Sequence, residues 1–577
     1  MPNIAIDGVT LEVMRNALQS IAEEMGVTLI RTALSINIKD RRDCSTAIYT
    51  PQGDLVAQAE HIPLHLGLMP TIMKAVLKAY PPNMLKPGDA IMINDPYISG
   101  SHLPDVCVFS PVFFDRELVA IVANLAHHCD IGGMAPGGMP VNATEIFQEG
   151  IRIAPVKVRK EGKLDEELVG FITNNVRTAF EFRGDMEAQL AANNVGEKRI
   201  KELAQKCGAP FIKIYMEEML NYSERRMRAR IKEMKPGVYA FEDFLEMGEA
   251  DLIPIKVAIA IEDDHMTVDF TGTGGQVKGS LNCTRGVTLA CVYYAVKAMT
   301  DPEIPSNGGA FRPVEVITPA GTVVNPQFPA AVSNANINTS QRITDCMLGA
   351  MAQVRPDRAM AACAGTMSLL TIGGIDPRTG TYYSYVETYG GGMGAVHNLD
   401  GMDGVHTNMT NTRNTPTEVM EMAFPLFVNK YSLIPESDGP GKYRGGLGLT
   451  REIVILDHEA HVTISTERSF TEPWGLFGGK PGRNSHCLLE QDGAVQVLPA
   501  RITTVIPANS KIIYQTPGAG GMGAPWERDP QDVLRDVMEG FISVERAKTA
   551  YGVAINAATL EIEENETRKL RQEKLSA

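Results

Sequence analysis

The sequence predicts a multi-domain α+β protein with an N-terminal helix, a mixed α/β first part, a β-rich second half and a helical C-terminal end. Three observations support this: apolar residues with helical spacing near the N-terminus, short β-prone runs between Gly- and Asn-rich turns beyond Val238, and a capped helical segment from Pro530 onward. A chain of 577 residues is too long for one ordinary core. We therefore divide it into a mixed α/β part, a β-rich part with Gly-rich loops and a C-terminal helical segment, at residues 1–237, 238–525 and 526–577.

The first elements follow from local spacing. Apolar residues three or four apart predict a helix over residues 8–34 whose stripe packs into the core rather than against a partner chain. The runs Ser45–Tyr49 and Leu55–Gln58 flank turn-forming residues and predict a hairpin. The helical stripe consists of Leu11, Met14, Leu18, Ile21 and Met25.

The remaining elements are predicted from periodicity and from turn residues. A helix over 71–79 leads into the strand 90–93, and two longer helices cover 187–205 and 211–234. Short strands such as 255–261 and 266–270 begin the β-rich half, where the Gly-rich stretches read as loops. In the C-terminal segment, Ser543 is expected to begin a helix as its N-cap and Gly552 to end it.

The composition is that of a folded globular protein, with 44% hydrophobic and 21% charged residues. A net charge of −15 without a basic stripe argues against nucleic acid as a partner. The N-terminus lacks the pattern of a secretion signal, and Asn124 interrupts the longest apolar run, so we expect no membrane segment. Nine scattered cysteines without a C-x-x-C pair favour a reducing cytoplasm over a disulfide framework or a Cys-type zinc site.

A predicted hairpin lies in the most informative stretch of the chain, between residues 94 and 130. Its β-prone runs, 106–114 and 118–126, are joined by a three-residue turn candidate, 115–117. If Phe114 pairs with Leu118, the antiparallel register places Asp105 directly opposite His127. Since side chains alternate along a strand, His128 then points to the other face.

The hairpin ends gather residues that can bind a metal ion. His102 lies three residues before Asp105, in a stretch that Pro104 stiffens. Two neutral imidazoles (His102 and His127) and a carboxylate suit a divalent ion, with zinc favoured and manganese as the alternative, and a catalytic site would keep an open position for water. A hydrogen-bonded polar cluster in a loop would explain the same spacing, so these residues alone leave both interpretations open.

A second histidine pair, His61 and His65, is spaced four residues apart and would share one face of a helix. Pro63 between them argues against a regular helix, which makes a metal pair doubtful. Substrate contact and ordinary loop polarity are equally good interpretations.

Several motifs together resemble the hydantoinase B/oxoprolinase family, and their order makes the resemblance run nearly end to end. The family includes hydantoinase, caprolactamase and 5-oxoprolinase parts and related subunits of acetone and acetophenone carboxylases. The motifs include Arg41-Arg42-Asp43-Cys44-Ser45, Asn94-Asp95-Pro96-Tyr97, Ser101-His102-Leu103-Pro104-Asp105, Ala126-His127-His128, Asp269-Phe270-Thr271-Gly272-Thr273, Gly439-Pro440-Gly441-Lys442-Tyr443-Arg444-Gly445-Gly446 and Thr516-Pro517-Gly518-Ala519-Gly520-Gly521.

This resemblance implies a catalytic subunit of an ATP-dependent hydrolase of cyclic amides. The implied metal ligands are Asp43, His102, Asp105 and His127. The implied partner is an ATP-binding hydantoinase A-type subunit, in an α2β2 heterotetramer or larger, which supplies ATP and Mg²⁺. The sequence contains no G-x-x-x-x-G-K-[ST] phosphate-binding loop, which agrees with ATP binding by the partner.

The expected reaction begins when the partner phosphorylates the amide oxygen, after which water attacks the activated carbon. A divalent ion would lower the pKa of that water, and His128, Asp95 or Asp130 would move the proton. Two alternatives remain. One is a subunit of an acetone/acetophenone-type carboxylase, and the other is a non-catalytic scaffold for the ATPase subunit.

Overall fold

Helix α1, Gly8–Thr32, begins the fold in the computed structural model, which describes residues 6–59 and 61–576. Asp7 caps it by accepting a hydrogen bond from the backbone N–H of Thr10. Four of the five stripe residues are buried, and the fifth, Leu11, is partly buried against the same cluster. Helices α6 (Ala179–Cys207) and α7 (Ala209–Lys232) contribute to this cluster, so the prediction that the stripe packs into the core is confirmed.

The first half of the chain is built on a seven-stranded sheet in the order β2-β1-β5-β4-β3-β6-β7. Both predicted hairpins are present, with antiparallel pairing of β1 with β2 and of β4 with β5. The strands are β1 Cys44–Tyr49, β2 Leu55–Gln58, β3 Ala90–Ile93, β4 Asp105–Phe114, β5 Glu117–His127, β6 Val156–Lys160 and β7 Lys163–Leu164.

The predicted register of the β4–β5 hairpin is correct at its open end and wrong at its turn. Phe114 pairs with Glu117, so the turn has two residues, Asp115 and Arg116, rather than three. A bulge between Val112 and Phe113 then shifts the pairing by one residue. Because the two departures compensate, Asp105 still lies opposite His127.

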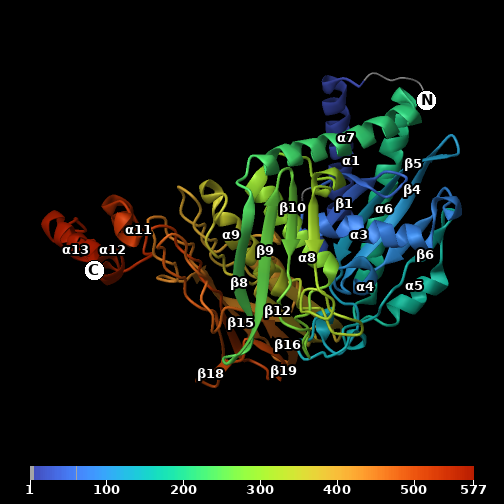
Figure 1. The fold of residues 1–577 in the computed structure, drawn as a ribbon. Helices are drawn as coiled ribbons and strands as arrows, with labels where there is room; N and C mark the ends of the chain where they lie inside the picture. The colour runs from blue at the N-terminus through green and yellow to red at the C-terminus, as the bar shows by residue number, and fades with distance from the viewer. Residues whose placement is uncertain (1–5, 60, 577) are drawn as a thin grey trace.

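Helices cover both faces of this sheet (Figure 1). Helices α1 and α6 pack on one face, while α3 (Pro63–Ala79), and beyond it α8 (Arg285–Thr300), lie on the other. Alternate residues of β1 serve the two cores: Ala47 and Tyr49 join one, and Ile48 joins the other. The helices of this half are α1, α2 Ile36–Lys39, α3 Pro63–Ala79, α4 Pro96–Ser99, α5 Glu166–Thr173, α6 Ala179–Cys207 and α7 Ala209–Lys232.

Helix α3 is longer than the predicted 71–79. Pro63 stands at its first helical position, where the missing N–H costs no hydrogen bond. Pro63 thus separates the two histidines, as expected: His65 is helical, whereas His61 precedes the helix, so no regular helix carries both.

Three further sheets form the β-rich half. A four-stranded sheet, β11-β10-β9-β8, packs on the core of the first sheet, and two more, β13-β12-β16-β19 and β14-β15-β20-β17-β18, follow. The strands are β8 Gly237–Gly248, β9 Asp251–Glu262, β10 His265–Asp269, β11 Val314–Ile317, β12 Leu369–Ile375, β13 Tyr382–Thr388, β14 Leu426–Leu433, β15 Leu449–Ile455, β16 Ala460–Ser465, β17 His486–Gln491, β18 Ala494–Leu498, β19 Arg501–Ile506 and β20 Lys511–Gln515.

Two buried helices in this half, α8 Arg285–Thr300 and α9 Thr339–Ala352, depart from the predicted strand pattern. Every described residue of α9 is buried, and α8 is buried over most of its surface, so neither has the amphipathic stripe by which a surface helix is recognised. A third helix, α10, covers Thr417–Ala423.

The C-terminal helices α11 Pro530–Met538, α12 Val544–Tyr551 and α13 Glu564–Ser576 lie at the end of the molecule opposite α1 (Figure 1). Ser543 caps α12 and Gly552 ends it in a left-handed conformation, both as predicted. Among the described residues, no helix combines the length and the apolar character needed to cross a membrane.

The largest hydrophobic core takes residues from both sides of position 237, including Leu68 of α3 and Val296 of α8. The three-part division of the chain remains a prediction.

Candidate metal centre

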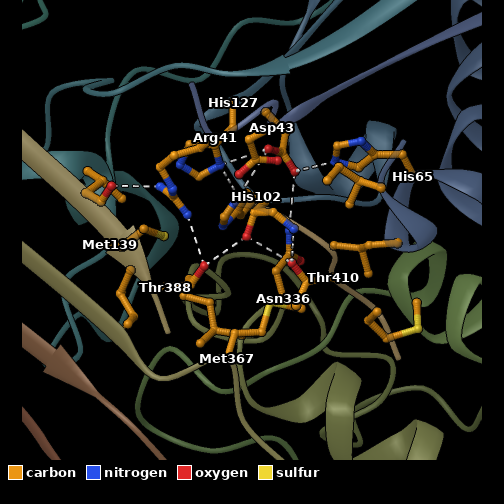
Figure 2. Close-up of a pocket in the computed structure, with 18 residues that line it drawn as sticks. Arg41, Asp43, His65, His102, His127, Met139, Asn336, Met367, Thr388 and Thr410 are labelled. Atoms are coloured by element: carbon orange, nitrogen blue, oxygen red, sulfur yellow. Dashed lines mark hydrogen bonds and ion pairs between the residues drawn. The ribbon is translucent and has the colours of Figure 1, made fainter. Parts of the chain in front are cut away.

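A pocket lined mainly by buried residues lies at the open end of the β4–β5 hairpin (Figure 2). Asp105 begins β4 and His127 ends β5, so the hairpin brings both to the same wall. His102 reaches this wall from the loop after α4. Asp43 precedes β1, whose pairing with β5 places it beside His127, and the backbone N–H of His127 donates to its carbonyl at 3.1 Å.

Three ligand-type atoms form a tight triangle. His127 Nδ1 lies 3.1 Å from both Asp105 Oδ1 and His102 Nε2, and His102 Nε2 lies 3.3 Å from Asp105 Oδ1. Donor atoms of one tetrahedral zinc ion, each about 2.0–2.1 Å from the metal, stand roughly 3.3 Å apart. The spacing of the three atoms therefore fits a shared divalent ion.

The tautomer of His102 also fits this interpretation. His102 Nδ1 lies 2.9 Å from the carbonyl oxygen of Ser333, which can only accept, so Nδ1 carries the proton. In the neutral ring, Nε2 then presents a lone pair to Asp105 and His127. A carbonyl that fixes the outer nitrogen is the usual support of a metal-binding histidine.

The carboxylate of Asp105 is held ionised. Burial raises its pKa, but His102 and His127 outweigh burial and keep the pKa well below the usual range. For His102, burial lowers the pKa, but Asp105, the Ser333 carbonyl and Asp43 together outweigh burial, so the net shift of the pKa is upward. The second oxygen, Oδ2, accepts hydrogen bonds from Ser101 Oγ and, at 3.3 Å, from Asn336 Nδ2.

Asp43 lines the same pocket but lies outside the triangle. It is only partly buried, and Figure 2 shows it on the wall that carries His127. The structure thus places all four residues implied by the family resemblance around one cavity, three of them in direct contact.

The structure does not bring the residues predicted for proton transfer to this pocket. His128 lies on the opposite face of the sheet, where Nε2 contacts Gln189 Oε1 at 3.1 Å and the ring packs 4.5 Å from that of Phe182. This follows from strand alternation, so assigning proton transfer to His128 conflicts with the geometry that places His127 in the site.

Asp95 and Asp130 have structural partners instead. Asp95 caps α4 and forms an ion pair with Arg152 at 3.4 Å. Asp130 accepts from the backbone N–H groups of Gly132, Gly137 and Arg177, and the Arg177 guanidinium lies 3.1 Å away. These contacts occupy both oxygens of Asp130, and neither aspartate lines the pocket.

Among the polar residues that line the pocket, three were predicted neither as metal ligands nor as proton-transfer groups and lie close to the site's polar atoms. His65 Nε2 lies 4.0 Å from Asp105 Oδ2, Asn336 contacts the same oxygen, and Arg41 lines the wall near Thr388. They come from α3, from the loop before α9 and from the turn after α2. The sequence signal for Asn336 is the amide-rich run 334–341 that contains it. His65 belongs to the histidine pair for which substrate contact was one interpretation, and Arg41 belongs to the motif Arg41-Arg42-Asp43-Cys44-Ser45.

Comparison with known proteins gives consistent matches. The family model described as Hydantoinase B/oxoprolinase matches residues 7–525. An uncharacterized protein of Methanocaldococcus jannaschii is 40% identical over 98% of this chain and 100% of its own length. A putative D-/L-hydantoinase B-type subunit of Pseudomonas sp. (strain NS671) is 32% identical, with 98% of each chain covered. The 5-oxoprolinase of Dictyostelium discoideum is 36% identical over 90% of this chain, which spans only 40% of that protein.

Two solved structures share the fold. The ATP-dependent caprolactamase from Pseudomonas jessenii matches with a TM-score of 0.91 and 29% identity, over 99% of this chain and 100% of that one. Nucleotide-free acetone carboxylase matches with a TM-score of 0.92, over 99% of this chain and 83% of that one. At 20% identity, this second likeness is one of fold alone. The predicted α+β fold class is confirmed.

Proposed function

The chain belongs to the hydantoinase B/oxoprolinase family, and we propose that it is the metal-dependent catalytic subunit of an ATP-dependent hydrolase of cyclic amides. The observation that carries this proposal is the buried triangle of His102, Asp105 and His127 at the wall of a buried pocket. Hydantoin, oxoproline and caprolactam, which appear in the names of similar proteins, are all cyclic amides.

The partner in this proposal is an ATP-binding A-type subunit that phosphorylates the amide oxygen, in an α2β2 or larger cytoplasmic assembly. A relative that matches this chain over nearly its full length is named as one subunit of a hydantoinase, which supports an arrangement of two different subunits. This sequence contains no P-loop motif, in agreement with ATP binding by the partner.

His102 Nε2, Asp105 Oδ1 and His127 Nδ1 would hold the metal ion, with Asp43 as the fourth ligand. Zinc is favoured because two imidazoles and carboxylates are typical of its sites, and manganese is the alternative. When bound, such an ion acts as a Lewis acid and lowers the pKa of water.

The chain's own residues shape the reaction space. Met139, Met367 and Leu369 supply apolar walls that exclude bulk water from a substrate, and Asn336 holds the carboxylate of Asp105 in place. Excluding water strengthens every electrostatic interaction in the pocket.

His65 is the best candidate for moving a proton. It lines the pocket, Ser45 Oγ lies 2.9 Å from its Nδ1, and its Nε2 faces the centre near Asp105. Burial lowers its pKa, which leaves a neutral imidazole able to accept a proton. His65 therefore replaces His128, Asp95 and Asp130 in this role.

The test is to purify the chain with an A-type partner and to measure ATP-dependent ring opening of hydantoins and lactams together with metal content. We expect about one divalent ion per chain, and His102→Ala should abolish ring opening while the subunits still co-purify. Metal-free protein with full activity would refute the proposal. Bicarbonate-dependent incorporation of labelled carbon without ring opening would identify a carboxylase instead, and unchanged activity of the His102 variant would identify a scaffold.

A further inference from the structure

A second pocket lies next to the metal pocket, where the start of α2, the start of α6 and β13 meet. Val386 of β13 lines both pockets, but none of the three residues of the metal triangle lines the second one. Leu34, Thr379 and Ala423 on its walls are exposed, so a small molecule can reach it from solvent.

One wall of this second pocket is aromatic. Tyr382, Tyr383 and Tyr385 of β13 line it together with Phe424. The Phe424 ring lies 5.7 Å from that of Tyr383 and 5.4 Å from that of Tyr385, with interplanar angles of 44° and 66°. Because the face of an aromatic ring attracts a cation within about 6 Å, this wall suits a positively charged group with an apolar body.

The charged groups that line the second pocket are acidic. They are Glu181 and Asp376, and no described Lys or Arg lies on the walls. Asp376 is neutralised by Arg378, whose Nη2 lies 2.8 Å from Asp376 Oδ2. Glu181 has no Lys, Arg or His nitrogen within 4.0 Å among residues 6–59 and 61–576, so its charge is uncompensated.

Another carboxylate without a cation lies behind this wall. Asp185 follows Glu181 by about one turn on the same face of α6 and is fully buried. Its Oδ1 accepts the backbone N–H groups of Leu34 and Ser35 at 2.8 and 3.0 Å, while its Oδ2 has no hydrogen-bond partner in the described part of the chain. The start of α6 contributes only about half a positive charge, which two carboxylates exceed, so the pocket favours a cation.

Hydroxyl oxygens can complete the binding of an ammonium group beside Glu181. Ser35 and Thr178 line the pocket at the starts of α2 and α6, and Thr379 and Thr381 line it from the turn between β12 and β13. Each hydroxyl oxygen has two lone pairs, and a primary ammonium has three N–H donors. These walls therefore offer both charge and hydrogen bonds to such a group.

We propose that the second pocket binds the primary ammonium group of a small organic amine, with Glu181 as its counterion and Tyr383 and Phe424 against its apolar body. Hydrolysis of a lactam breaks the C–N bond: the carbon takes the oxygen of water to become a carboxylate, and the nitrogen becomes a primary amine. With a pKa near that of Lys, about 10.4, this amine is protonated at neutral pH, whereas the lactam is uncharged. The pocket thus distinguishes product from substrate, an assignment that rests on the proposed function, whereas the ammonium site itself does not.

The test is a titration followed by saturation-transfer NMR on the metal-loaded, full-length chain without ATP. The probes are n-butylammonium, butyramide and butyrate, which share a four-carbon chain and carry a positive, no or a negative charge. The pocket variants are Glu181→Gln and Phe424→Leu. Glu167→Gln is the matched control, because Glu167 is exposed on α5 and its replacement removes the same charge outside the pocket.

We expect n-butylammonium to bind the wild type and Glu167→Gln at least tenfold more tightly than the other two probes. Glu181→Gln should weaken ammonium binding about tenfold through loss of a charge-assisted hydrogen bond. Phe424→Leu should weaken it about threefold through loss of a cation–π contact. Equal binding of the three probes, or unchanged ammonium binding to Glu181→Gln, would overturn the inference.

His102→Ala separates this pocket from the metal centre, because it removes a proposed metal ligand and leaves the second pocket intact. The variant should bind n-butylammonium with wild-type affinity. Loss of binding in His102→Ala would place the ammonium in the metal pocket and refute the assignment. A failure of ring opening in the activity test leaves the ammonium site standing and removes only its link to the product.

Discussion

Asp105 and His127 face each other across the β4–β5 hairpin, with Asp105 Oδ1 3.1 Å from His127 Nδ1. The neighbour of His127 in the chain, His128, lies on the other face of the same sheet against Phe182. Two adjacent buried imidazoles therefore serve different purposes, one in the candidate metal centre and one in the packing of α6 on the sheet.

This relationship predicts opposite outcomes for two alanine substitutions. His127→Ala removes a ligand and should lower metal affinity by roughly 100-fold or more, since even the partners of ligands contribute about 10–100-fold. His128→Ala should keep the metal but lose about 2–4 kcal/mol of unfolding free energy, because it leaves a cavity beneath α6. Metal analysis and urea unfolding measure the two effects, and equal metal loss in both variants would contradict the assignment.

The sequence was sufficient for elements whose signal is local. The stripe of α1, both hairpins and the Ser543 cap depend on residues within a few positions of one another, and the structure confirms them. Helix α8 could not be predicted in this way, because burial over most of its surface removes the periodic contrast between apolar and polar faces.

The residues of the candidate site also differ in whether their sequence signal is local. Asp105 and His127 were paired because one hairpin carries both, whereas Arg41 and Asn336 reach the pocket by tertiary packing that no spacing rule describes. The residues predicted for proton transfer, His128, Asp95 and Asp130, come from the same stretch, 94–130, as three of the predicted metal ligands. Strand alternation and local backbone contacts direct those side chains elsewhere.

The β4–β5 turn offers a stabilising substitution. Asp115 and Arg116 both have positive φ, 49° and 68°, a conformation that Asn-Gly adopts more readily. The double change Asp115→Asn and Arg116→Gly should raise the unfolding free energy by about 1 kcal/mol without altering metal content. As a control, Asp115→Val should lower the unfolding free energy, since a β-branched residue is strained at positive φ. A destabilised Asn-Gly variant, measured by urea unfolding, would argue against this turn geometry.

Glu149 is predicted to support the metal centre from outside it. Its Oε1 accepts the backbone N–H groups of Val332 and Ser333 at 2.9 and 2.8 Å, which orients the Ser333 carbonyl toward His102 Nδ1. Glu149→Ala should weaken metal binding by about 10–100-fold in a chelator competition assay. Glu149→Gln keeps the accepting oxygen and should stay within about threefold of the wild type. If Glu149→Ala binds the metal with wild-type affinity, the loop that carries Ser333 keeps its position without Glu149.

From the raised pKa of Glu149 we also predict that the stability of the metal-free chain depends on pH. Burial raises the pKa of Glu149 from 4.5 to about 8, outweighing the N–H groups that favour the charged form. Between pH 4.5 and 8 the folded state then keeps a proton that the unfolded chain has lost. The unfolding free energy must therefore fall as pH rises, by at most about 1.4 kcal/mol per pH unit from this group.

Glu149→Gln cannot lose that proton, so its stability should decline less steeply over this range, and the two proteins should converge near pH 4.5. Urea unfolding at intervals from pH 5 to 9 measures both slopes, and Glu167→Gln, at an exposed position, is the control for removing one carboxylate. Parallel curves for the wild type and Glu149→Gln would mean that Glu149 is ionised in the folded chain. Its charge would then have to be stabilised by the loop that holds Ser333 against His102.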